Sequence, residues 1–155
     1  MRPGAVLLLL AVLAPATAAL GAGRPACELL SLDEVGRIAG ARVAIDPSAS
    51  GEDDRGGDNC VWKVGGQVVL EMRVQRSPSP QQAQLAFTRT RSEAFGPRPE
   101  PARVAGLGDE ALYRDFEKVK GGALIVRRGA IVVGMSGSLP RDAYLSLARL
   151  VLGRF

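Results

Sequence analysis

The chain has 155 residues, of which 46% are hydrophobic, so it is long enough for one domain with a single core. Its 20 Lys and Arg residues exceed its 16 Asp and Glu residues, but they are scattered as on a solvated surface and do not indicate nucleic-acid binding. Histidine is absent, which excludes Ser-His-Asp and Cys-His nucleophilic sites and every histidine-containing zinc site.

Residues 1–18 are predicted to form a secretory signal peptide. Arg2 supplies a short positive start, an unbroken apolar run covers residues 5–14, and small residues follow. The apolar run is too short for a stable membrane span, which needs about 20 residues. Ala16 and Ala18 form an A-x-A pattern, so we expect cleavage after Ala18, or as late as Gly23. The mature chain, 19–155, is then one soluble domain that is periplasmic or secreted.

A lipid anchor on Cys27 is the competing interpretation, because this cysteine lies soon after the apolar run. Bacterial lipobox sequences need small or apolar residues before the cysteine, typically with Leu three positions ahead. Here those positions hold Arg24, Pro25 and Ala26. We therefore expect an unlipidated chain.

Cys27 and Cys60 are the only cysteines, and they lie 33 residues apart. In an oxidising compartment an even cysteine count favours disulfides. A redox role would favour a C-x-x-C motif or a neighbouring cation, and this spacing offers no such motif. The two residues are predicted to form a structural disulfide.

The segment 31–40 is predicted to be the first helix, because Ser31 and Glu34 match a capping box and Gly40 suits the C-terminal stop. A short strand over 41–45 and a loop over 46–58 follow. The loop holds five acidic residues, so calcium has to be considered, but their spacing does not match a calcium-binding loop. A flexible surface loop without a metal is predicted, and no cofactor is expected.

A hairpin is predicted next, over 59–75. Cys60, Trp62 and Val64 would share one face of its first strand. A two-residue turn at 65–66 would put Trp62 opposite Val69, whereas a three-residue turn at 65–67 pairs Trp62 with Leu70. The three-residue turn is therefore predicted. The expected core residues are Trp62, Leu70, Met72 and Val133, and a ligand-stacking role is the alternative for Trp62.

The second half of the chain is predicted to contain two helices and a further hairpin. Ser79 and Pro80 mark the start of the second helix, which runs to residue 95. The second hairpin, 123–135, is predicted to turn at Arg128-Gly129, and residues 140–155 form the last helix. This order predicts an α+β fold: three helices and a mostly antiparallel sheet of about five to six strands, with helices on one face.

The segment "VAGLGDEALY" is the one stretch that suggests catalysis. Asp109 and Glu110 are adjacent, however, so on a strand they point to opposite faces and form no carboxylate pair. The "GLGDEA" stretch also lacks the third glycine of a phosphate-binding loop. The glycines are predicted to shape a turn in which Asp109 caps backbone N–H groups, and no catalytic residue is predicted.

Several motifs together resemble a family of small exported bacterial domains, typified by actinobacterial lipoproteins of unknown function. These motifs are the early "CELLSLDEV", the later C-x-W, "VAGLGDEALY" and the terminal apolar hairpin with its helix. The resemblance implies a fold similar to the PsbP-like α/β/α sandwich and pairing of Cys27 with Cys60. It supplies no catalytic residues, and the Arg24-Pro25-Ala26 segment departs from the lipoprotein members.

These observations favour a non-catalytic envelope protein that binds another protein, a lipid or a cell-wall component. Val61, Val69, Ile125 and Val132 are predicted to lie on the sheet face away from the main core. They would form a contact patch if no helix covers them. The alternative is a histidine-free hydrolase that acts on envelope polymers through carboxylates, which would need two of them about 5–9 Å apart in a cleft.

Overall fold

The computed structural model describes residues 23–97 and 99–155, so the predicted signal peptide lies outside the described residues. The helices are a 3₁₀ turn η1 (Ala26–Glu28), α1 (Leu32–Ala39), α2 (Pro80–Phe95) and α3 (Arg141–Leu152). The strands are β1 (Ala44–Ile45), β2 (Gly51–Glu52), β3 (Gly57–Val64), β4 (Gln67–Arg76), β5 (Ala102–Arg103), β6 (Glu110–Asp115), β7 (Gly122–Arg128) and β8 (Ile131–Gly137).

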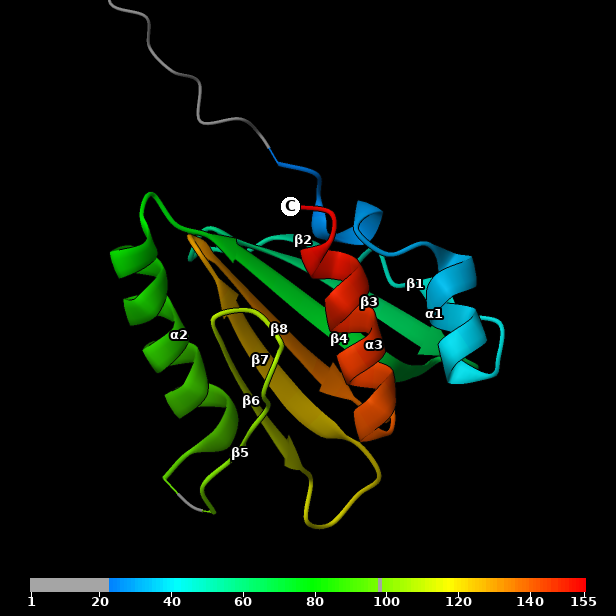
Figure 1. Ribbon diagram of the computed structural model, residues 1–155. Helices are drawn as coiled ribbons and strands as arrows, with labels where there is room; N and C mark the ends of the chain where they lie inside the picture. Colours follow the sequence, from blue (N-terminus) through cyan, green and yellow to red (C-terminus); the bar gives the residue numbers. More distant parts are fainter. Residues whose placement is uncertain (1–22, 98) are drawn as a thin grey trace, which may run out of the picture.

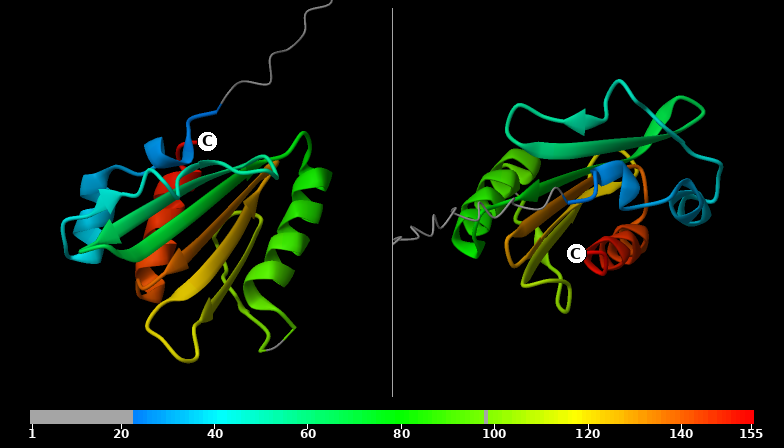
Figure 2. Two further views of the ribbon diagram at one scale, coloured as in Figure 1. Left: turned by 180° about the vertical axis from the view of Figure 1, so that it is seen from behind. Right: turned by 90° about the horizontal axis from the view of Figure 1, so that it is seen from above.

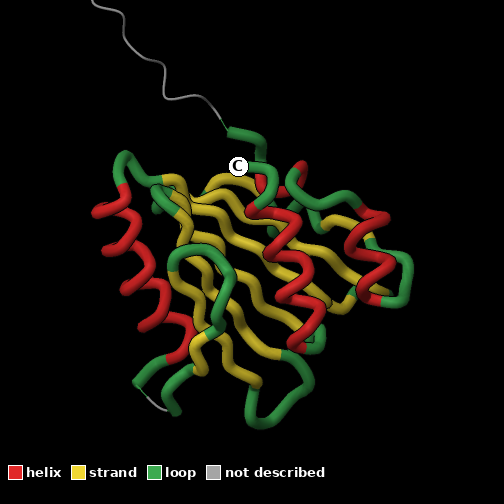
Figure 3. The backbone as a smooth tube through the Cα atoms, in the orientation of Figure 1, coloured by secondary structure: helices red, strands yellow, loops and turns green. Residues whose placement is uncertain are grey.

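The strands form one open antiparallel sheet in the order β1-β3-β4-β8-β7-β6-β5, and β2 also pairs with β3 (Figures 1 and 3). The predicted α+β class with three α-helices is confirmed. The predicted number of strands is too low, because the described residues form eight and β1, β2 and β5 have only two residues each. A two-residue strand is too short for the alternating pattern by which strands are recognised.

Helices cover both faces of the sheet: α1 and α3 lie on one face and α2 on the other (Figures 1 and 2). The prediction that one face is covered was wrong. Strand β7 shows the reason, because Leu124 and Val126 face α3 while Ala123 and Ile125 face α2, and all four are buried. A strand that is apolar on both faces needs cover on both.

The main core lies between the sheet and α1 and α3. The four residues expected in the core, Trp62, Leu70, Met72 and Val133, all lie in this cluster, and the first three are fully buried. A second, smaller cluster lies between the sheet and α2, where Phe87 contacts the strands. Among the described residues, no helix is both long enough and apolar enough to cross a membrane.

The β3–β4 hairpin differs from its predicted form at the turn. The predicted three-residue turn was wrong, because Val64 pairs with Gln67 across a two-residue turn of glycines, both with positive φ. The expected pairs of Trp62 with Leu70 and Cys60 with Met72 are nevertheless present. A β-bulge restores them, because β4 contains one extra residue, Val69, between the partners of Lys63 and Trp62.

The β7–β8 hairpin turns one residue later than predicted, at Gly129-Ala130, because Arg128 pairs with Ile131. Gly129 adopts a φ of 56°, which favours glycine. The predicted shared face is retained, since Leu124 pairs with Met135. An even shift in pairing leaves each side chain on its original face.

The helix termini follow the predicted local signals. Ser31 caps α1 in a complete capping box with Glu34, and Gly40 ends the helix in the left-handed conformation. Ser79 caps α2 by accepting a hydrogen bond from the N–H of Gln82, and Pro80 is the first helical residue. Both predicted helix starts are confirmed.

The predicted disulfide joins Cys27 to Cys60, with the two Cα atoms 5.0 Å apart. It links the chain at η1 to the middle of β3. Asp58 of β3 accepts a hydrogen bond from the main-chain N–H of Ala26, and Arg154 beyond α3 donates to the carbonyl of Leu29. The N-terminal segment is therefore held covalently and by hydrogen bonds from both β3 and the C-terminal end.

Candidate functional site

The four residues predicted as a contact patch do not form an exposed surface. Ile125 and Val132 lie beneath α2 in the second core cluster. Val61 is buried, and its N–H donates to Ser50 Oγ at 3.1 Å. Val69 is the bulge residue and packs partly against the main core. These four residues form no exposed patch, because α2 covers Ile125 and Val132, Val61 is buried and Val69 packs toward the main core.

The acidic loop 46–58 is tied to the sheet by separate contacts. Asp46 pairs with Lys63, which lowers the pKa of Asp46 to about 2. Asp53 pairs with Arg73 at 2.6 Å, and this hydrogen bond holds the pKa of Asp53 well below its usual value. Asp58 bonds to η1. Within the described residues, no group of three or more His, Cys, Asp or Glu side chains could hold a metal ion.

The "VAGLGDEALY" segment contacts the turn of the β7–β8 hairpin through Asp109. Asp109 accepts a hydrogen bond from the N–H of Gly129 at 2.7 Å, so it caps the turn of the β7–β8 hairpin and not, as predicted, the turn shaped by its own neighbouring glycines. Glu110 instead accepts from Gln84 of α2 at 3.3 Å. Gly108 has a φ of 63°, a conformation that favours glycine. The two adjacent carboxylates therefore serve different elements and do not converge.

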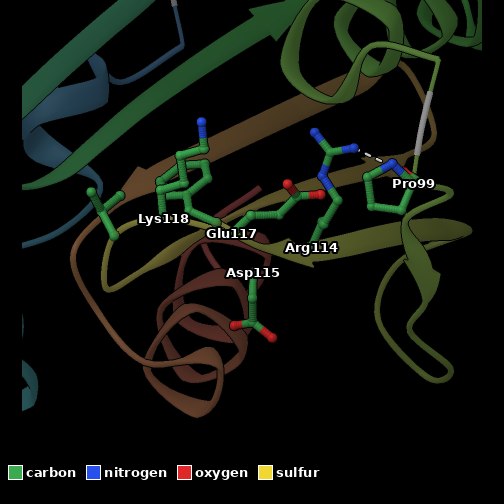
Figure 4. Close-up of a pocket in the computed structure, with 7 residues that line it drawn as sticks. Pro99, Arg114, Asp115, Glu117 and Lys118 are labelled. Carbon is green, nitrogen blue, oxygen red and sulfur yellow. Dashed lines mark hydrogen bonds between the residues drawn. The ribbon is translucent and has the colours of Figure 1, made fainter.

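A hollow of about 540 Å³ lies beside the loop between β6 and β7, and we take it as the candidate functional site (Figure 4). One wall is Pro99, in the connector between α2 and β5, and the other is the segment 114–119. Phe116 is 36% exposed and Val119 is 65% exposed. Two large apolar side chains thus face solvent at the hollow, where a partner could bury them.

The base of the β6–β7 loop is formed by Arg114 and Asp115 at the end of β6, and Arg114 holds its α2 side. Its guanidinium donates to the carbonyl of Pro99 at 2.8 Å, and it lies 5.2 Å from the centre of the Phe95 ring at the end of α2. The first contact bridges the two walls of the hollow (Figure 4). This hydrogen bond holds Pro99 beside the end of β6.

The opposite side of the loop base is held by Asp115, which points away from Arg114 (Figure 4). Asp115 accepts a hydrogen bond from the hydroxyl of Tyr113 at 2.6 Å. The Tyr113 ring packs against Tyr144 of α3, with 6.1 Å between ring centres. Burial and the neighbouring carboxylate raise the pKa of Tyr113, so the hydroxyl keeps its proton and donates. Both faces of the loop base are thus fixed, and the tip projects from them.

One side of the hollow carries more cationic than anionic side chains. The side chains of Arg114 and Lys118 point to the same side, with Glu117 between them (Figure 4). In the described part of the chain, none of these three groups forms an ion pair within 4.0 Å. Asp115 points to the other side and bonds to Tyr113. This side of the hollow therefore presents two cations and one anion, which favours an anionic ligand.

The residues of this hollow were not among the predicted site residues. The segment 116–120 reads Phe-Glu-Lys-Val-Lys, and Phe and Val within a polar hairpin loop could have indicated an exposed apolar contact. Pro99 could not have been associated with this loop from the sequence, since 15 residues separate it from Arg114. Only the antiparallel pairing of β5 with β6 brings the two walls together.

No protein-family model matches this chain, and no curated protein matches it significantly. The fold defines an α+β domain with an open antiparallel sheet and one disulfide. Its function has to be inferred from the chemistry of the hollow.

Proposed function

We propose that this chain is an exported, non-catalytic accessory domain that binds a protein, a lipid or a cell-wall component of the envelope. The observation that supports the proposal most directly is the hollow beside the β6–β7 loop. Its apolar residues Phe116 and Val119 are exposed, although the loop base is fixed on both faces. A preformed surface of this kind loses little conformational entropy on binding.

The arrangement of the molecule is compatible with such a role. The described chain begins and ends at one end of the domain, and the β6–β7 loop projects at the other (Figures 1 and 2). A partner at the hollow would therefore lie away from Gly23 and Phe155, where the described chain begins and ends. The helices on both faces of the sheet also agree with the proposed similarity to exported domains of the PsbP-like sandwich type.

Export is the second part of the proposal, and the disulfide supports it, because such bonds persist in oxidising compartments. We expect exported protein to begin near Ala19 and to carry no lipid. Intact-mass spectrometry of protein recovered from the envelope measures both properties. A diacylglyceryl adduct on Cys27 would contradict the unlipidated form and the disulfide together.

The rival hydrolase needs two carboxylates that converge in a cleft. In the described residues, Asp46 and Asp53 are engaged by Lys63 and Arg73, and Asp109 caps a turn. These contacts favour binding over catalysis. Turnover of purified wall polymers by the wild-type domain, abolished by replacing one carboxylate with its amide, would instead establish the hydrolase.

Site-specific photo-crosslinking tests the binding site. A photoreactive residue replaces Val119 in the hollow or, as the matched control, Val68 on the β3–β4 hairpin, which is 42% exposed. Each variant is irradiated in the envelope of the source organism. We expect an adduct from position 119 that excess wild-type domain suppresses, and none from position 68. Equal adducts from both positions, or none from either, would refute the proposed site.

A further inference from the structure

Among the residues that the structure describes, none pairs as a strand with the outer edge of β6 beside the hollow. β5 pairs with β6 only through Ala102 with Tyr113 and Arg103 with Leu112, and the N–H of Val104 donates to the carbonyl of Ala111. In an antiparallel ladder, alternate residues direct their main-chain groups to the same side. Ala111, Tyr113 and therefore Asp115 face the outer edge.

The other side of the ladder supports this assignment. The N–H of Phe116 donates to the carbonyl of Gly121, so Phe116 and Arg114 direct their main-chain groups toward β7. Among the described residues, β5 ends before it reaches Asp115, and the main-chain groups of Asp115 have no strand partner on the outer edge. Within the described chain, the N–H and C=O of Asp115 thus lie unpaired at the edge of the hollow.

In the described part of the chain, the connector that precedes β5 does not extend the pairing with β6. Residues 99 and 101 are prolines, but in this register their main-chain groups would point away from β6, and the residue that would pair with Asp115 is Glu100. Pro101 is buried, whereas Pro99 is exposed on the far wall of the hollow. The chain therefore diverges from β6 between these prolines, and the hollow occupies the position where β5 would have continued.

We propose that the occupant of the hollow is an extended acidic segment of a partner protein, which adds as a strand to the free edge of β6. This inference rests on the proposed function. Main-chain hydrogen bonds to Asp115 supply affinity, as in other strand additions, and alternate side chains supply specificity. Apolar side chains of the segment contact Phe116 and Val119, and its carboxylates lie near Arg114 and Lys118.

The same features disfavour two other occupants. A second copy of this chain, paired edge to edge through β6, would bring Arg114 and Lys118 toward the same residues of its partner, and like charges repel. An anionic membrane surface would satisfy the cations but would leave the N–H and C=O of Asp115 without a strand partner. An acidic peptide strand matches the edge, the apolar walls and the charge together.

The first test is peptide selection on the folded domain. A phage-displayed library of random nine-residue peptides is selected on wild-type protein, with counter-selection on the Val119→Asp variant. We expect the selected peptides to alternate apolar residues with Asp or Glu. A basic or non-alternating consensus, or the absence of any peptide that depends on Val119, would overturn the inference.

The second test uses the synthetic consensus peptide and fluorescence anisotropy. N-methylation of alternate peptide nitrogens blocks strand pairing without changing side chains, and we expect it to weaken binding at least tenfold. Lys118→Glu should weaken binding about tenfold and reduce its salt dependence. Arg89→Glu, at an exposed position on α2, is the matched charge control and should leave binding unchanged. Equal affinity for the native and N-methylated peptides would overturn the strand addition.

Failure of this inference can be distinguished from failure of the proposed function. If crosslinking at position 119 captures a lipid or a glycan and no acidic peptide binds, the domain is a binding module with another kind of ligand. If the peptide instead promotes self-association of the domain, measured by analytical ultracentrifugation, the free edge serves a second copy and the inference is wrong. Thermal melts of the Val119→Asp and Lys118→Glu variants confirm that both are folded.

Discussion

Removal of the Cys27–Cys60 disulfide should lower the stability of the domain by an amount that follows from its position in the chain. The two residues are 33 positions apart, and the loop-entropy relation for a closed loop of this size gives about 3–4 kcal/mol. Unfolding entropy of about 2.1 cal/mol/K per residue gives about 0.28 kcal/mol/K for residues 23–155. The melting temperature should therefore fall by about 11–14 °C.

The folded state should change little when the bond is lost. The N-terminal segment retains the hydrogen bond from Ala26 to Asp58 and the contacts of Arg154 with Leu29 and Glu34. The destabilisation should thus arise mainly because the unfolded chain gains conformational freedom. The circular dichroism spectrum at 25 °C should be unchanged.

The assay compares oxidised wild type, reduced wild type and the Cys27→Ala/Cys60→Ala double variant by thermal denaturation. Reduced wild type keeps both sulfur atoms in the chain, so it separates the entropy of the unfolded state from lost packing at the buried Cys60. Both reduced wild type and the variant should melt well below the oxidised protein. A melting temperature for reduced wild type within about 3 °C of the oxidised value would refute the reasoning. So would two reactive thiols per chain in unreduced protein from the envelope.

Three further predictions concern individual side chains. Trp62→Ala should lower the free energy of unfolding by about 3–5 kcal/mol in urea denaturation, because a fully buried aromatic side chain is removed. A variant that is as stable as wild type but loses binding would instead indicate that Trp62 is part of a ligand site. Arg154 lowers the pKa of Glu34 in the folded protein from 4.5 to about 2. The contact between Glu34 and Arg154 therefore stabilises the folded state above pH 4.5, and this stabilisation is lost as the pH falls toward 2. Glu34→Gln should therefore reduce the acid-induced fall in melting temperature over that range, and an identical fall in both proteins would contradict this assignment. Asp109→Ala should cost about 1 kcal/mol of unfolding free energy by removing the cap at Gly129, and an unchanged urea midpoint would contradict that role.

Features that depend on neighbouring residues could be predicted from the sequence. The capping box of Ser31 and Glu34 spans three positions, and Ser79 likewise caps α2 through a residue three positions later. Such hydrogen bonds form within a single turn, so the chain needs no distant partner to specify them. The disulfide could also be predicted, because a chain with a predicted export signal and only two cysteines leaves one intramolecular pairing.

Features that depend on packing between distant segments could not be predicted in this way. The bulge at Val69 compensates for the two-glycine turn, and a turn preference alone does not reveal such an insertion. The apolar surface that α2 covers combines Leu112 of β6, Ile125 of β7 and Val132 of β8, which only a completed sheet brings together. Asp109 likewise meets Gly129 across 20 residues.

The candidate site is the clearest case of a feature decided by the tertiary structure. Phe116 and Val119 could be recognised in the sequence as apolar residues of a loop, but not as one wall of a hollow. The second wall, Pro99, reaches them because β5 pairs briefly with β6 and then diverges. Hydrogen bonds within one turn are specified by local sequence, whereas a cavity depends on where separate segments stop packing against each other, and that is set only when the whole chain has folded.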